Sequence, residues 1–294
     1  MVLTTYRKKG IRLSHVWFAT EEELASLVQS QKGKTDLVYA HGLQVPCGGW
    51  RAVSSQNTLI KMLDSDESVI YQTFGKHLRK FIQRSISEGT VIRLLSGTEI
   101  TDEVLDTCLR LYNKMKKDKG LSGTFNTALA KKYAAAGNLI ISQACVGATV
   151  IGFKSSVIDD RHLRGWVSAF AFREEKFDTQ VVSRAHQLLE WETMRWCCRN
   201  GITSYDFGGI ASFDDPNGID KFKMTFAKEG QRATYDNYLV GISPLGKAAV
   251  LGYWLLKEIR KKGRTCNVPD PLGRCVRSYE YRSLGSCRAD AGRK

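Results

Sequence analysis

The chain has 294 residues, of which 43% are hydrophobic and 25% charged, a balance that allows a buried core and excludes wholesale disorder. Its formal net charge of +14 predicts a surface that attracts phosphates of RNA, nucleotides or anionic lipid headgroups. The longest apolar run, at residues 248–256, is far shorter than the roughly 20 residues of a membrane-spanning helix. The basic N-terminus leads into no apolar signal core, so we expect a cytoplasmic protein.

The cysteines and histidines do not predict a metal site. None of the eight cysteines has CxxC spacing, and the five histidines are scattered. Cys145, Cys197 and Cys198 have apolar neighbours and are expected to be small core residues in a reducing compartment. Three more cysteines lie in the polar tail and can be exposed: Cys266, Cys275 and Cys287.

Residues 1–95 are predicted to form a reduced N-terminal α/β subdomain, because short apolar runs alternate there with turn signals. A basic helix is expected near its end, where Leu78, Phe81, Ile82 and Ile86 follow a helical stripe and Gly89 stops the pattern. The expected strands are residues 11–19, 36–39, 50–53, 58–63 and 91–94, and the expected helices are residues 21–31 and 71–88.

Residues 96–262 are predicted to form a transferase domain, followed by a basic C-terminal tail at residues 263–294. The expected helices are residues 102–119, with Thr101 as N-cap, and 124–136, 179–200 and 245–262. The expected strands are residues 139–145, 149–158, 163–172, 203–207 and 232–239, with a short helix or turn at 222–226.

This order of elements is that of an acetyltransferase-like (GNAT-like) α/β fold, with a mixed, mostly antiparallel sheet flanked by helices. In that fold, the long helix after the three-stranded meander begins where two central strands splay apart. The acyl donor lies in that gap, against backbone groups and the helix N-terminus, which favours anionic groups. Fold order alone does not settle the function.

Residues 205–223 indicate chemistry, because a predicted buried strand leads there to two glycines, an acidic loop and a lysine close to two aromatics. Folding alone rarely requires this order of parts, and departures from local rules cluster at functional sites. A second interpretation is open, in which Phe222 and Phe226 are ordinary helix core and Lys223 is a surface charge.

The same stretch resembles the FemABX family, together with the LLEW run at residues 188–191 and the CRNG run at 198–201. The basic helix at residues 78–89 is also similar to the helix that leads into the fold in that family. The resemblance covers roughly residues 75–240. It implies transfer of amino acids from aminoacyl-tRNA onto peptidoglycan precursors, and related bacterial acyltransferases act in polysaccharide and natural-product pathways. FemABX enzymes usually carry two copies of the fold, whereas this chain has room for one full copy and a reduced one.

The resemblance places a Phe-Lys pair beside the reacting ester, and the matching residues are Phe222 and Lys223. It implies that the Lys223 ammonium stabilises the tetrahedral oxyanion and that Phe222 stacks on the terminal adenosine of tRNA. Asp206 ends a strand beside a turn, where a carboxylate can receive a proton from the attacking amine or bond to its own backbone.

Further residues are predicted to bind substrate, each with a structural alternative. Gly208 and Gly209 permit a tight turn or a close ligand approach. Arg184 is a candidate for a donor or acceptor phosphate, or is a solvated helix charge. The remaining candidates, which either pack or line the cleft, are Tyr205, Trp191 and Arg79.

The junction between the three-stranded meander and the long helix indicates which acyl donor the protein uses. Enzymes of this fold that use acetyl-CoA usually carry a glycine-rich turn there, whose backbone N–H groups hold the CoA pyrophosphate. The corresponding residues 172–179 read FREEKFDT, with no glycine and three acids. This composition favours a donor of the FemABX type over CoA.

The sequence therefore predicts an amide-forming acyltransferase. It moves an aminoacyl group from aminoacyl-tRNA, a co-substrate, to an amine of a cell-wall precursor or a peptide-like small molecule, and it needs no cofactor. The first alternative is an acyl-CoA-dependent N-acyltransferase acting on an amino sugar or nucleotide sugar. The second is a non-catalytic protein that binds RNA or a membrane surface, and a peripheral membrane contact is compatible with each.

Overall fold

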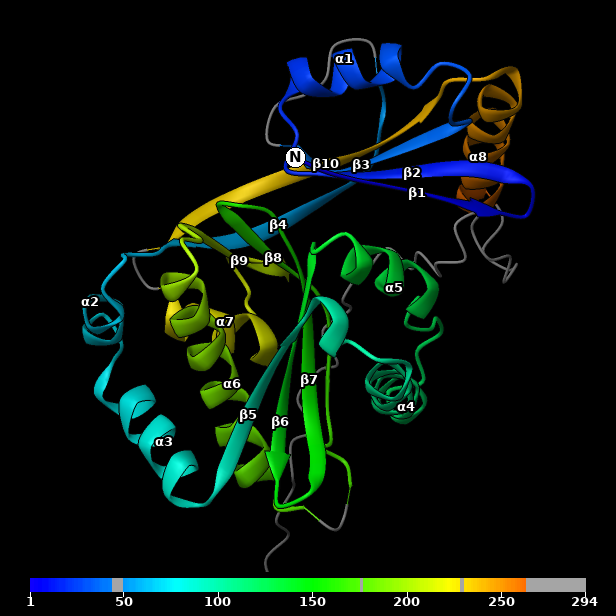
Figure 1. Ribbon diagram of the computed structural model, residues 1–294. Coiled ribbons are helices and arrows are strands. Elements are labelled where there is room, and N and C mark those ends of the chain that lie inside the picture. Colours follow the sequence, from blue (N-terminus) through cyan, green and yellow to red (C-terminus); the bar gives the residue numbers. More distant parts are fainter. Residues whose placement is uncertain (44–49, 175–176, 228–229, 263–294) are drawn as a thin grey trace, which may run out of the picture.

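The computed structural model describes residues 1–43, 50–174, 177–227 and 230–262 (Figure 1). Its strands are β1 (Val2–Lys8), β2 (Ile11–Trp17), β3 (Leu37–Leu43), β4 (Ala52–Met62), β5 (Thr90–Ser96), β6 (Leu139–Val146), β7 (Thr149–Ile158), β8 (His162–Phe170), β9 (Ser204–Ile210) and β10 (Gln231–Gly241). Its helices are α1 (Glu21–Ser30), α2 (Glu67–Gln72), α3 (Lys76–Ser87), α4 (Asp102–Asp118), α5 (Thr127–Ala135), α6 (Thr179–Arg199), α7 (Gly218–Phe226) and α8 (Pro244–Lys262), with a short 3-10 turn at Gly97–Glu99.

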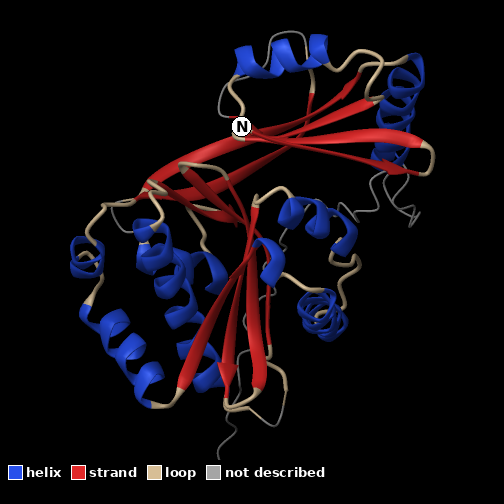
Figure 2. Cartoon of the chain, in the orientation of Figure 1, coloured by secondary structure: helices blue, strands red, loops and turns tan. Residues whose placement is uncertain are grey.

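The ten strands form one sheet in the order β1-β2-β3-β10-β4-β9-β8-β7-β6-β5. Only the β2–β3 and β8–β9 pairs are parallel. The sheet is therefore mixed and mostly antiparallel and is flanked by helices, which confirms the predicted fold class (Figure 2).

Helices cover both faces of the sheet. Along β3, side chains alternate between the two faces, so Leu37 and Tyr39 pack beneath α8 while Val38 and Ala40 pack beneath α1. On the other half of the sheet, α3 and α6 lie on one side and α4 and α5 on the other (Figure 1). The indole Nε1 of Trp17 donates to the Tyr133 hydroxyl at 2.7 Å, which ties β2 to α5.

The structure differs from the prediction in three elements near the N-terminus. The helix expected at residues 71–88 is two helices, because Gly75 has extended backbone angles and Phe74 turns into the core against Trp191. Phe81 and Ile86, which were expected on the buried stripe, are exposed, since α3 packs on α6 through Leu78 and Ile82. The polar-looking β1 pairs with β2, and the two expected strands at residues 50–63 are the single strand β4.

The predicted division near residue 95 stays a prediction. In the sheet, β10 lies between β3 and β4, so a late segment of the chain completes the part built by the first 62 residues. Helix α8 packs on the same part. The tail at residues 263–294 lies outside the described residues.

The cysteines that fall within the structure behave as expected of core residues. Cys145, Cys197 and Cys198 are buried and free, whereas the cysteines of the tail lie outside the described residues. Across the described part of the chain, no helix is both long and apolar enough to cross a membrane.

Candidate active site

The central strands separate at the position where the fold predicts a donor site. β8 and β9 pair in parallel only from His162 and Ser204 to Arg164 and Asp206, and they diverge beyond that point. Gly208 lies at the divergence with φ of +73°, and a Cβ there would come within 2.7 Å of the Gly165 carbonyl oxygen. Glycine is therefore required at position 208 both for its backbone angles and for the close approach of the two strands.

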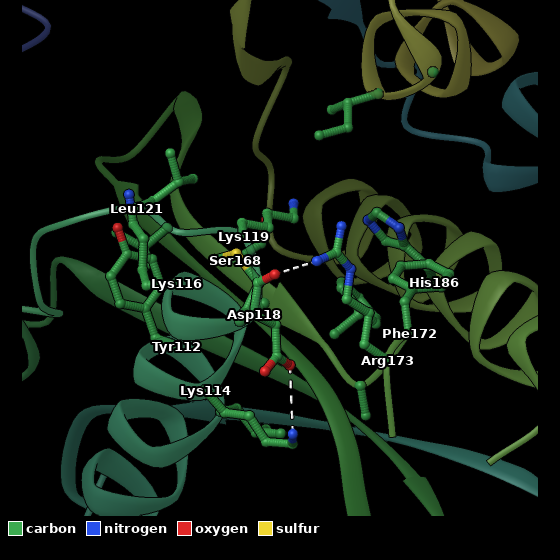
Figure 3. Close-up of a pocket in the computed structure, with 18 of the residues that line it drawn as sticks. Tyr112, Lys114, Lys116, Asp118, Lys119, Leu121, Ser168, Phe172, Arg173 and His186 are labelled. Carbon is green, nitrogen blue, oxygen red and sulfur yellow. Dashed lines mark hydrogen bonds and ion pairs between the residues drawn. The ribbon is translucent and has the colours of Figure 1, made fainter. Parts of the chain in front are cut away.

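A cleft of about 840 Å³ opens at this divergence (Figure 3). It is bounded by the C-terminal half of α4, β8, α6, the end of β9 and the start of α7. Its aromatic lining consists of Tyr112, Trp166, Phe170, Phe172, His186 and Phe222. Its cationic lining consists of Lys114, Lys116, Lys119 and Arg173. The carboxylates of Asp118 and Glu174 also line the cleft, so cations are in excess there but are not alone. An apolar, aromatic floor with an excess of positive charge suits an anionic substrate that carries a planar group.

His186 lies in this cleft between two phenyl rings. Its ring centroid is 3.9 Å from that of Phe170 and 4.0 Å from that of Phe222. Its Nε2 atom is 3.7 Å from Oε1 of Glu190, one turn further along α6. Burial lowers the pKa of His186 below its ordinary value. The neighbouring Glu190 carboxylate raises this pKa, whereas the charges of Lys154 and Lys223 lower it further. The imidazole is therefore neutral near pH 7 and can accept a proton.

Behind His186, a buried ion pair fixes the position of Glu190. The Lys154 ammonium contacts the two carboxylate oxygens at 2.7 and 3.1 Å and also donates to the Tyr205 hydroxyl at 2.9 Å. That hydroxyl donates to Glu190 at 2.6 Å. Burial alone would raise the pKa of Glu190, but the adjacent Lys154 charge holds it well below its usual range. Glu190 is therefore a carboxylate that orients its neighbours.

We expect Glu190→Gln to lower the free energy of unfolding by about 3–5 kcal/mol, because it leaves the Lys154 ammonium buried without a counter-charge. Both side chains are almost inaccessible, at 4% and 5% exposed. Urea denaturation followed by circular dichroism measures the loss. The double variant Lys154→Met/Glu190→Gln is expected to recover most of it, and a single variant as stable as the wild type would show that the pair is not electrostatically coupled.

Lys223 lies beside the same cleft, on α7. Its ammonium donates to the carbonyl oxygens of Gly209 at 2.5 Å and Gly208 at 3.2 Å, at the end of β9. Burial, followed by repulsion from Lys154, lowers the pKa of Lys223 to about 8. Two of its three N–H groups are thus committed to backbone oxygens, and one remains for another acceptor.

The sequence profile of the family described as acetyltransferase (GNAT) domain matches residues 73–224, just over half of the 294-residue chain. The chain belongs to the GNAT acetyltransferase family. The profile covers β5 to β9 and most of α7, and thus includes the β8–β9 divergence, His186 and Lys223. The protein is therefore an acyltransferase of the GNAT type.

Solved structures show the same fold at low sequence identity. A crystal structure of FemX superposes with a TM-score of 0.54 and 12% identity, over 80% of this chain and 83% of that chain. The C-terminal domain of a protein described as a lysylphosphatidylglycerol synthetase, from Agrobacterium fabrum, superposes with a TM-score of 0.50 and 11% identity, over 85% and 83%. No curated protein matches the sequence. This GNAT acyltransferase is thus FemABX-like in fold.

The cleft of this GNAT-family protein is lined by some of the predicted residues. Phe222 and Gly209 line it, and Lys223 lies next to them. Tyr205 is fully buried behind it, in the hydrogen-bonded group with Lys154. Gly208 shapes the strand divergence, and its predicted contact with substrate stays a prediction.

Asp206 occupies a different environment, with contacts to both neighbours of β9 in the sheet, β4 and β8. It accepts hydrogen bonds from the Thr58 hydroxyl and, at 2.7 Å, from the Gly208 backbone N–H. Its other oxygen lies 3.5 Å from Nε of Arg164. These contacts favour the turn-forming interpretation, and its predicted role in proton transfer stays a prediction.

The other predicted substrate-binding residues lie away from the cleft. Arg184 forms two hydrogen bonds of 2.7 Å with Glu88, which tie α6 to the end of α3. Trp191 is buried against Tyr71 and Phe74. Arg79 lies half-buried on α3. A substrate contact of these three residues stays a prediction.

Sequence reasoning did not single out His186, Glu190 or Lys154. Two signals were present: His186 and Glu190 are four residues apart on a predicted helix, and Lys154 is the one charged residue of the strand predicted at 149–158. Neither signal reveals that the three lie together, because 36 residues separate Lys154 from Glu190. In the described part of the chain, no group of three or more His, Cys, Asp or Glu is arranged to hold a metal ion.

Proposed function

We propose that this GNAT acyltransferase forms an amide by moving an aminoacyl group from aminoacyl-tRNA to the amine of a cell-wall precursor or a peptide-like small molecule. The observation that carries the proposal is the pairing, beside one cleft, of a lysine ammonium with an uncommitted N–H and a neutral histidine. Amide formation from an ester needs both a cation for the oxyanion and a base for the amine. The proposal places the protein in the cytoplasm, where aminoacyl-tRNA is available.

The reaction follows from these two groups. The acceptor amine attacks the ester carbonyl carbon and forms the new C–N bond, and the Lys223 ammonium stabilises the oxyanion. His186 takes the proton that the amine loses and becomes an imidazolium beside the Glu190 carboxylate. The intermediate then collapses, the ester C–O bond breaks, and the leaving ribose oxygen takes the proton from His186 and becomes the free hydroxyl.

The choice of tRNA over CoA is supported by the N-terminus of α6. Asp178 caps this helix and accepts a hydrogen bond from the backbone N–H of Gln180 at 2.7 Å. A carboxylate at this position competes with a pyrophosphate for the same N–H groups. Lys116 and Lys119 lie instead at the C-terminal end of α4, where burial and the charges of Arg173 and Lys116 lower the pKa of Lys119. Such a cluster of cations is stabilised by a polyanion such as the end of a tRNA.

An acyl-CoA-dependent N-acyltransferase acting on an amino sugar or nucleotide sugar is the alternative. The description of the matching family as an acetyltransferase favours it. Lys119 and Arg173 on the rim can also hold a pyrophosphate.

Donor choice is tested by incubating the full-length protein with charged tRNA, an acyl-CoA pool and a panel of amines, and detecting amides by mass spectrometry. We expect product that disappears after RNase treatment of the donor mixture and persists when acyl-CoA is omitted. Product that survives RNase and requires acyl-CoA would replace the proposal with the alternative. Binding of RNA or vesicles without turnover of any donor would contradict both and favour a non-catalytic protein.

A further inference from the structure

Helix α8 presents a row of large aliphatic side chains to solvent. Leu251, Leu255 and Ile259 are spaced four residues apart, and they are 61%, 57% and 63% exposed. Leu245, in the first turn, is 53% exposed. We call these four residues the α8 stripe. With Leu256, which is also exposed, α8 holds five of the thirteen large hydrophobic side chains that are exposed in the described part of the chain.

The stripe is not a poorly packed core face. The opposite face of α8 is buried in the sheet, where Tyr253 packs against Leu13, Tyr39 and Leu239. The helix is thus already anchored to the protein, and the stripe remains as a second apolar face. Soluble proteins rarely leave such a row exposed unless it contacts a partner or a membrane.

Along the sequence, the stripe is followed by an excess of positive charge. The Arg51 guanidinium lies 3.9 Å from the centre of the Trp254 ring. It also contacts Glu258, the one acidic residue in the sequence of α8, at 3.8 Å, so the charge of this carboxylate is neutralised. From Lys257 to Lys294 the sequence holds eleven Lys or Arg against four Asp or Glu, a net of +7. Aliphatic side chains beside a tryptophan and many cations are typical of helices that lie in the surface of an anionic membrane.

We propose that the α8 stripe docks this protein on an anionic lipid bilayer, with α8 in the plane of the membrane surface. Leu251, Leu255 and Ile259 enter the boundary between headgroups and acyl chains, and the cations contact lipid phosphates. A second copy of this chain is disfavoured as the occupant, because two surfaces of the same positive sign would face one another. The inference is independent of the donor and acceptor proposed above.

The test is co-sedimentation of the full-length protein with vesicles of phosphatidylcholine, with or without phosphatidylglycerol. We expect binding to the anionic vesicles, weaker binding to the neutral ones, and a decrease as salt rises. Leu251→Ser/Leu255→Ser is expected to weaken binding at least about 10-fold, because it removes apolar area that the bilayer would bury. The matched control, Val69→Ser/Ile86→Ser, changes two exposed aliphatic side chains on α2 and α3 and is expected to bind like the wild type.

Three results would overturn the proposal. The first is no vesicle binding by a wild-type protein whose circular dichroism shows that it is folded. The second is a stripe variant that binds as tightly as the wild type, which would assign binding to the basic charges alone. The third is a wild-type dimer in sedimentation velocity that the stripe variant disperses, together with no vesicle binding, which would make a second copy the occupant.

Discussion

Replacing Lys223 by methionine is expected to slow single-turnover amide formation by about 100- to 1000-fold, the usual effect of removing one oxyanion donor. Methionine keeps the length and apolar character of the side chain but removes the ammonium. The two glycine carbonyls that now position the charge would lose their donor, yet the strand divergence is held by Gly208 itself. Quenched-flow measurement with preformed enzyme–donor complex isolates this step from binding.

The matched control for this variant is Lys221→Met, which makes the same change at an exposed position of the same helix. It is expected to react at the wild-type rate. A Lys223→Met enzyme with an unchanged single-turnover rate would remove Lys223 from the mechanism.

The pKa of Lys223 also predicts a pH dependence. The ammonium is the active form, and burial lowers its pKa to about 8. The transfer rate should therefore fall as pH rises through about 8, and this decline should be absent from the residual activity of Lys223→Met. A wild-type rate that stays constant well above pH 8 would contradict the role of the ammonium.

Replacing His186 by phenylalanine is expected to lower the single-turnover rate by about 100- to 10,000-fold, the range for loss of a general base. Phenylalanine keeps an aromatic ring between Phe170 and Phe222, so the walls of the cleft are preserved. The neutral imidazole is the active form, and its pKa lies below the ordinary value. The wild-type rate should therefore rise with pH through an acid limb below that value, and the variant should lack this limb.

His77→Phe is the matched control, since His77 is exposed on α3 and the chemical change is identical. If His186→Phe lost activity but kept the acid limb, His186 would be a positioning residue and another group would be the base. Loss of donor binding without a change in rate would instead assign the histidine to recognition.

Much of the transferase fold followed from local patterns. Thr101 caps α4 as predicted, and the expected ranges of β6, β7, β8 and the long helix α6 agree with the structure within a few residues. The break between α2 and α3 was missed because the side chain that interrupts the helix, Phe74, turns inward only to meet Trp191, which is more than a hundred residues away.

The site could be predicted in part. The resemblance to the FemABX family, together with the unusual order of residues 205–223, pointed to Phe222 and Lys223; Phe222 lines the cleft and Lys223 lies next to it. Arg184 is a candidate for a phosphate because it lies one turn into the long helix. The structure shows it held by Glu88, 96 residues earlier in the chain.

By itself, the sequence determined the order of elements, the acidic junction before α6, the lysine of α7 and the excess of positive charge. Periodicity, caps and glycine turns depend on neighbouring residues, so they can be read along a chain. Only the tertiary structure decided that β10 inserts between β3 and β4, and that Lys154, Glu190 and Tyr205 meet behind His186. These contacts join segments that are distant in the sequence. Their burial keeps Lys154 and Glu190 as a paired cation and anion, and it lowers the pKa of His186 so that this side chain is neutral.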